Sequence, residues 1–281
     1  MNMIKQIIAG VGIVHAIISH VAAADVREPV ALRHEVLNNK SYRMKDIVEY
    51  VQTKKRSSTL VVFDIDNTLI MGTNPYMSPA SIHRHGAKLQ ELKNTYGNSV
   101  GEAGSYYSIK SPQQPIEDGT NGTAASVKKL QNLGYSVIAC TAAVSGKCGD
   151  IQDTGKAREK QLADYNISFS KSYSSIHTKC DLEKGESFCS GIYLLGHERK
   201  GEFIARLLTQ NPSITQVVLI DDKINILNKA KEHFEGIKNT GFMGIEYQEA
   251  NKMYTESQYQ DGELFKQNLE TEIVQYKKHG K

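Results

Sequence analysis

Short hydrophobic runs alternate with amphipathic segments along most of this chain. The runs, rich in β-branched side chains, lie at residues 59–63, 135–141, 217–222 and 241–247. Segments with apolar residues at helical spacing lie at 43–54, 123–134, 155–165, 200–208, 225–234 and 256–278. Apolar runs of this length are typical of strands covered on both faces, and such strands belong to parallel sheets. Because strands alternate with helices, the pattern predicts an α/β fold, a parallel sheet flanked by helices with right-handed crossovers.

Two stretches interrupt this alternation. Residues 71–116 are bounded by Gly- and Pro-containing turns and hold one predicted helix near 79–96, so we expect a small insert there. Residues 171–197 hold a short strand-like run at 172–179 and another at 191–195, which predicts a hairpin insert. A further short strand is predicted at 167–170.

Cysteine spacing adds a hypothesis about the hairpin insert. Cys180 and Cys189 flank its polar turn, and a disulfide between them would stabilise the fold by roughly 2–3 kcal/mol. A zinc cluster of His177, Cys180, Cys189 and His197 is the alternative, but its spacing matches no common structural zinc site. The pattern therefore favours the disulfide.

The first 24 residues have the form of a secretory signal. Lys5 precedes an apolar stretch at 7–18, and small residues end at Ala24, where cleavage is predicted. An uncleaved anchor or a core helix is the alternative reading. No later segment approaches the ~18 apolar residues needed to span a bilayer. We expect no membrane association after cleavage, and a periplasmic or secreted protein with an N-terminal helical segment at 25–58 and one main domain at 59–281.

Composition limits the remaining possibilities. With 281 residues, of which 40% are hydrophobic, the chain can bury one sizeable core. The net charge is +3, and lysines are interleaved with acidic residues. No basic patch is evident, so nucleic acid is not an expected partner.

Acidic pairs follow two of the predicted strands. The run at 59–63 leads into Asp64-Ile65-Asp66-Asn67-Thr68, and the run at 217–222 ends in Asp221-Asp222. Ligands of open α/β sheets bind at the carboxyl edge, where these carboxylates should lie. Carboxylates so close together repel unless a cation neutralises them or one keeps a proton.

These motifs resemble those of the haloacid dehalogenase (HAD) superfamily of phosphohydrolases. The Asp64-x-Asp66-x-Thr68 motif is followed, in the family's order, by a strand ending in Thr141, a helix opening with Lys200, and the pair Asp221-Asp222. Gly244-Ile245-Glu246-Tyr247 adds a likeness to a group of exported bacterial HAD-like proteins. The resemblance implies a HAD-like Rossmannoid sheet in which the insert at about 71–116 forms a cap.

The same resemblance implies a role for each motif residue. Asp64 would attack phosphorus, while Asp66 would act as general acid and base and offer its backbone carbonyl to the metal. Thr141 and Lys200 would bind the phosphoryl group and offset its charge. Mg²⁺ would be held by Asp64, Asp66 and Asp222, with Asp221 orienting Lys200 or a water on the metal. His83 and His85 in the insert could contact substrate, although polar-helix histidines are more often simply exposed.

Taken singly, each motif has a bland explanation. Asp-x-Asp is often a solvated turn, a threonine at a strand end usually satisfies nearby backbone, and paired acids before a helix often cap it. Together they predict a Mg²⁺-dependent phosphatase that hydrolyses a phosphomonoester, either a phosphorylated small molecule or a phosphoprotein. The alternative is a secreted interaction or effector protein with a residual site on the same scaffold.

Overall fold

A seven-stranded sheet forms the centre of the protein. The computed structural model describes residues 33–38, 42–171, 183, 185–196 and 199–279, so the predicted signal segment lies outside the described residues. The strands are β1 (His34–Leu37), β2 (Thr59–Phe63), β5 (Ser136–Thr141), β6 (Ser187–Cys189), β7 (Ile192–Leu194), β8 (Gln216–Asp221) and β9 (Gly241–Glu246). They are arranged in the order β1-β9-β8-β2-β5-β7-β6, and every neighbouring pair except β6 and β7 is parallel. The mostly parallel sheet confirms the predicted α/β fold.

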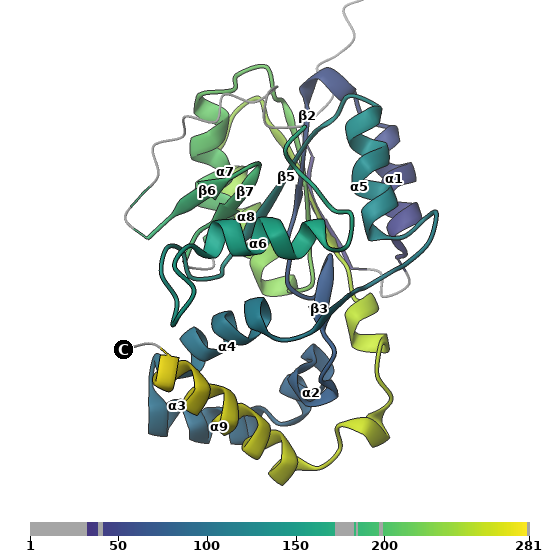
Figure 1. Cartoon of the computed structure of the whole chain (residues 1–281). Coiled ribbons are helices and arrows are strands. Elements are labelled where there is room, and N and C mark those ends of the chain that lie inside the picture. Colours follow the sequence, from purple (N-terminus) through teal and green to yellow (C-terminus); the bar gives the residue numbers. More distant parts are fainter. Residues whose placement is uncertain (1–32, 39–41, 172–182, 184, 197–198, 280–281) are drawn as a thin grey trace, which may run out of the picture. The chain divides into compact units, whose positions relative to one another are not determined.

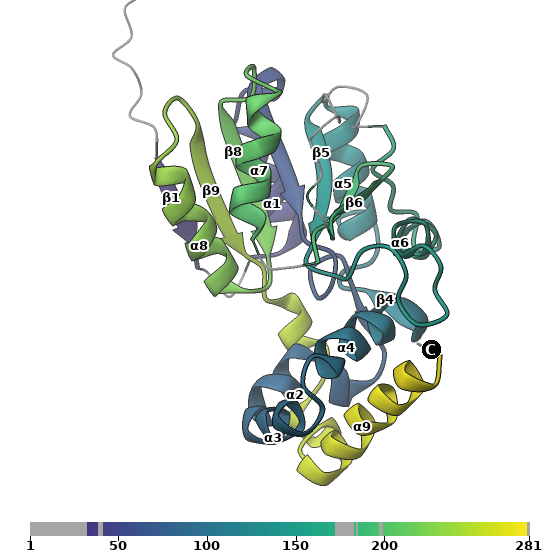
Figure 2. The ribbon, with the colours of Figure 1, turned by 90° about the vertical axis from the view of Figure 1, so that its left-hand side faces the viewer.

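Helices cover both faces of the sheet (Figures 1 and 2). Helices α1 (Met44–Gln52) and α5 (Thr123–Asn132) pack on one face, and α7 (Lys200–Thr209) and α8 (Ile224–Glu235) pack on the other. In β2, Val61 and Phe63 join the core of the first face, whereas Leu60 and Val62 join that of the second. Because side chains alternate between two buried faces, no polar residue follows Thr59 in this strand.

The sheet edge beside β1 differs from the prediction. Residues 25–58 were expected to contribute only a helical segment, but His34–Leu37 pairs in parallel with β9. All four residues are only partly buried, as expected at an edge. A run of four residues with one charge is too short to give a strand signal.

The short strand predicted at 167–170 does not form. Residues 167–170 follow α6 (Thr154–Ala163), and Asn166, with φ of 59°, reverses the chain so that the Ile167 amide bonds to the Leu162 carbonyl. Ile167 and Phe169 are each 1% exposed because they pack into the core under the sheet. The alternation of apolar and polar residues at 167–170 therefore reflects a buried loop. The strand that pairs with β7 at this edge of the sheet is β6.

The hairpin was also predicted with the wrong strand. Residues 181–188 were expected to form a turn, but Ser187–Cys189 forms β6 and pairs with β7 through a two-residue turn at Ser190 and Gly191, both with positive φ. The other expected strand, at 172–179, lies outside the described residues. So do His177, Cys180 and His197, which belong to the predicted disulfide and to its zinc alternative. Cys189 itself is a free cysteine in the structure. The Cys189 thiol donates a hydrogen bond to Glu159.

A layer of helices lies at the carboxyl edge of the sheet. The segment between β3 (Ile70–Gly72) and β4 (Gln113–Pro115) forms α2 (Pro79–Arg84), α3 (Gly86–Tyr96) and α4 (Ser99–Lys110). The single helix predicted near 79–96 is therefore two, broken at His85, and α4 was not predicted. The insert is more helical than its sequence pattern indicated.

The C-terminal helix α9 (Gly262–His279) belongs to this layer (Figure 2). It packs on α3 and α4 through one apolar cluster, which comprises Leu92, Val100, Ala103, Phe265, Leu269 and Ile273. We call α2, α3, α4 and α9 the cap. The cap is thus built from two chain segments, and five of the seven strands of the sheet, β5 to β9, lie between them in the sequence. No helix within the described ranges is long and apolar enough to cross a membrane.

Candidate functional site

Three neighbouring strands deliver the predicted site residues to one place. Asp64 directly follows β2, Thr141 ends β5, and Asp221 ends β8 with Asp222 next in the chain. Because β2 lies between β5 and β8 and all three are parallel, their carboxyl ends meet. Lys200, the first residue of α7, reaches the same point.

Lys200 joins two of the carboxylates. Its Nζ atom donates to Asp64 Oδ1 at 2.6 Å and to Asp221 Oδ2 at 2.5 Å, and the residue is 3% exposed. Burial alone would lower the pKa of Lys200, but Asp221 and Asp64 outweigh it and raise the pKa. Lys200 is therefore a fixed cation beside Asp64.

The same point could hold a metal ion. Asp64, Asp221 and Asp222 each offer an oxygen, and these oxygens all lie within 4.8 Å of one another. Burial, followed by the charges of Asp221 and Asp64, raises the pKa of Asp222 well above its ordinary value. Burial also raises the pKa of Asp221, although Lys200 opposes the shift.

Charge and hydrogen bonding both indicate that a cation fits there. The Oδ1 atom of Asp222 is buried and has no hydrogen-bond partner among the described residues. Lys200 pairs with Asp64 and Asp221, and the charges of these two groups, together with burial, outweigh Lys223 and raise the pKa of Asp222, so a bound cation would stabilise its carboxylate. Hard oxygen ligands of this kind suit Mg²⁺. The side chain of Asp66 is not part of this group, and a role for its backbone carbonyl stays a prediction.

Asp66 is held instead by an arginine that sequence reasoning missed. Arg158 Nη2, from α6, lies 2.7 Å from both carboxylate oxygens of Asp66. Thr141 Oγ1 donates to Asp66 Oδ2 over a longer 3.4 Å and accepts from the Ala143 amide at 3.2 Å. Arg158 is 0% exposed, whereas the Asp66 side chain is 29% exposed. Nothing in the polar sequence of α6 marks Arg158 as a buried residue.

Arg158 also connects the site to the cap. Its Nη1 atom donates to the Ser108 carbonyl at 3.0 Å, and Nη2 donates to Ser108 Oγ at 2.5 Å. Gln161 accepts from Nη1 at 2.7 Å and donates to the same Ser108 carbonyl at 2.8 Å. One buried guanidinium therefore links Asp66, α6 and cap helix α4.

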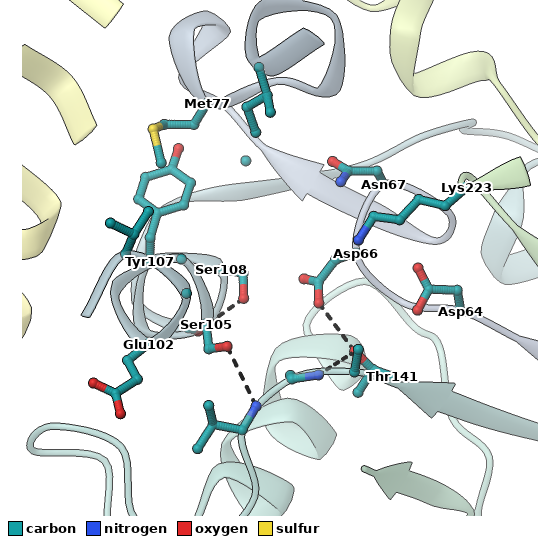
Figure 3. A pocket seen from close by; sticks show the side chains of 18 of the residues that line it. Asp64, Asp66, Asn67, Met77, Glu102, Ser105, Tyr107, Ser108, Thr141 and Lys223 are labelled. Atoms are coloured by element: carbon teal, nitrogen blue, oxygen red, sulfur yellow. Dashed lines mark hydrogen bonds between the residues drawn. The ribbon is translucent and has the colours of Figure 1, made fainter. Parts of the chain in front are cut away.

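A cavity of about 920 Å³ separates the site from the cap. Asp64, Asp66, Thr141 and Lys200 line its sheet side, and Ser105 and Ser108 face them from α4 (Figure 3). Neither His83 nor His85 lines it. His83 is exposed, and His85 contacts the Tyr259 carbonyl at 2.8 Å and stacks on Phe265. His85 therefore fastens α9 to the rest of the cap.

Comparison with known proteins gives a family without a function. Residues 40–281 match the family model described as "Protein of unknown function (DUF2608)", and the chain belongs to that family. No curated protein and no solved structure matches the chain significantly. The function must be argued from the site.

Proposed function

We propose that this chain is a Mg²⁺-dependent HAD-type phosphatase that hydrolyses a phosphomonoester through an aspartyl-phosphate on Asp64. The observation that carries the proposal is the position of Lys200 Nζ, 2.6 Å from Asp64 and 2.5 Å from Asp221, beside three carboxylates able to share a cation. A nucleophile with its own cation and a metal site within reach is what phosphoryl transfer requires.

The residues divide the reaction into two displacements. A carboxylate oxygen of Asp64 forms a bond to phosphorus while the ester P–O bond breaks, and Asp66 gives its proton to the leaving oxygen. Water then attacks the phosphorus of the acyl phosphate and gives a proton to Asp66, while the P–O bond to Asp64 breaks, so that phosphate leaves and the Asp64 carboxylate is restored. Each proton and each P–O bond is thereby accounted for.

The other residues bind and orient. Lys200 offsets charge on the phosphoryl oxygens, and Thr141 can donate its hydroxyl to one of them. Arg158 fixes the direction of the Asp66 carboxylate through its two contacts of 2.7 Å. Asp64, Asp221 and Asp222 would hold Mg²⁺, which when bound neutralises phosphate and carboxylate charge.

The test combines kinetics with detection of the intermediate. The purified protein should hydrolyse p-nitrophenyl phosphate with Mg²⁺, lose activity in EDTA, and show phosphorylated Asp64 by mass spectrometry after a rapid acid quench. Asp64→Asn should abolish both signals, whereas Asp118→Asn, at an exposed position, should preserve them. A folded, Mg²⁺-loaded protein without activity on a broad phosphomonoester panel would contradict the proposal.

We further propose that the reaction takes place in the periplasm or outside the cell. The support is the signal-like pattern of residues 1–24. Cell fractionation with N-terminal sequencing of the mature protein tests it. A full-length protein in the cytoplasmic fraction would contradict the proposal.

A further inference from the structure

Cap helix α4 carries two glycines that packing does not explain. Gly101 and Gly104 lie inside the helix, where glycine is a poor helix former. A Cβ atom added at either position would meet nothing within 4 Å. Gly201 in α7 is different, because a Cβ there would lie 2.8 Å from Ala230 Cα. Close packing thus requires glycine in α7 but not in α4.

The space left by these two glycines belongs to the cavity. Gly101 and Gly104 line it together with Ser105 and Ser108, so α4 contributes little side-chain volume at these four positions. Larger side chains of the same helix, among them Glu102 and Tyr107, line other parts of the cavity (Figure 3). Asp64 and Lys200 line the same cavity from the sheet. The volume is therefore continuous with the site at which phosphorus would react.

Other cap residues show what kind of group the space suits. Ile82, 36% exposed, and the partly buried Met77 turn apolar surface to the cavity. Tyr107, which is 8% exposed, lines it as well. The polar side chains of Asn98 and Glu102 also line the cavity. Apolar surface with a small number of polar groups is typical of a pocket for an organic ligand.

We propose that the cap side of the cavity binds the organic group of the substrate, and that this group is bulky and partly apolar. The inference rests on the proposed phosphatase function and selects a phosphorylated small molecule over a phosphoprotein. At about 920 Å³ the cavity falls near the top of the range for drug-sized ligands, roughly 300–1,000 Å³. A phosphoryl group alone would leave most of it empty. Gly101 and Gly104 are specificity-determining positions.

Two substrates of different size test whether the space beside Gly101 and Gly104 holds the organic group of the substrate. The kcat/KM of Gly101→Leu and Gly104→Leu for 4-methylumbelliferyl phosphate should fall at least about tenfold. Their kcat/KM for acetyl phosphate, which needs no room beside α4, should change less than about threefold. Gly86→Leu is the matched control, since Gly86 is also helical, has no atom within 4 Å of a Cβ, and does not line the cavity.

Alanine variants and the wild type show whether a negative result contradicts the pocket or the phosphatase function. Gly101→Ala and Gly104→Ala should raise Tm, because alanine favours helix, and should reduce turnover of the bulky ester less than leucine does. Folded leucine variants that keep the wild-type ratio of the two kcat/KM values, whether neither value falls or both fall equally, would overturn the proposed pocket. If the wild type hydrolyses neither of these two compounds nor any member of the phosphomonoester panel, the phosphatase proposal itself fails.

Discussion

Replacing Asp222 by asparagine should stabilise the protein when no metal is bound. The Asp222 Oδ1 atom is buried without a hydrogen-bond partner among the described residues, and Asp221 and Asp64 add like charge. Each unit by which the pKa of a carboxyl is raised on folding disfavours its charged form by about 1.4 kcal/mol. Asp222→Asn removes the charge with little change of shape, so the free energy of unfolding in EDTA should rise by about that amount for each unit. For a chain of this size Tm should rise by about 2–4 °C per kcal/mol.

The direction of the pH dependence follows from the raised pKa of Asp222. The folded protein holds that proton more tightly than the unfolded chain, whose aspartates titrate near pH ~3.9. The stabilising contribution is therefore complete below that pH and is lost as pH rises through the folded pKa. In EDTA the advantage of Asp222→Asn should be absent at low pH and greatest above the folded pKa.

Magnesium should favour the wild type and offset most or all of that advantage. A ligand at 100 times its Kd stabilises the wild type by about 2.7 kcal/mol, and Asp222→Asn should lose most of that gain. Urea unfolding of both proteins at pH 8, in EDTA and in Mg²⁺, measures all four values, with Asp118→Asn as the exposed control. A variant less stable than wild type in EDTA, or equally stabilised by Mg²⁺, would refute the reasoning.

Three further substitutions test the site and the cap. Lys200→Met removes the cation that bridges two carboxylates and should lower kcat on p-nitrophenyl phosphate by roughly 10²–10³; a change below threefold would exclude a role in the transition state. Arg158→Met breaks a buried ion pair with Asp66 and should lower the free energy of unfolding by about 3 kcal/mol in urea titrations; unchanged stability would show that the pair is not formed in solution. Phe265→Ala, at a residue 0% exposed, should cost about 3–5 kcal/mol by the same titration. Its neighbour Leu264, 42% exposed, should tolerate alanine within about 0.5 kcal/mol, and equal losses would contradict the packing of α9.

Central elements were predictable because their environment leaves a strong pattern. Strand β2 is buried on both faces, so every residue from Thr59 to Phe63 is buried. The observed bounds of β2 equal the predicted ones. Asp64 and Thr141 could be chosen because they lie at the ends of such strands, and Lys200 because it begins an amphipathic helix. Local sequence therefore specified which residues meet at the sheet edge.

What escaped prediction depends on partners far away in the chain. Arg158 lies in a helix of mostly polar residues, and its burial follows only from contacts with Asp66 and Ser108. Helix α9 has an evident apolar side, but that side does not reveal whether it packs on the sheet or on the cap. Helix α4 was not predicted because Gly101 and Gly104, which line the cavity, lower its helix propensity.

The divided origin of the cap has a consequence for biosynthesis. Leu92 and Ile273 meet in one apolar cluster although they lie 181 residues apart in the chain. The chain emerges from the ribosome, or through a membrane during export, with Asp64, Lys200 and Asp222 ahead of α9, so these three side chains can come together before α9 packs on α3 and α4. Closing that long loop is a late and slow step. Chains that stop before Gly262 would keep all three clustered aspartates, but α3 and α4 would expose the apolar surface that α9 covers.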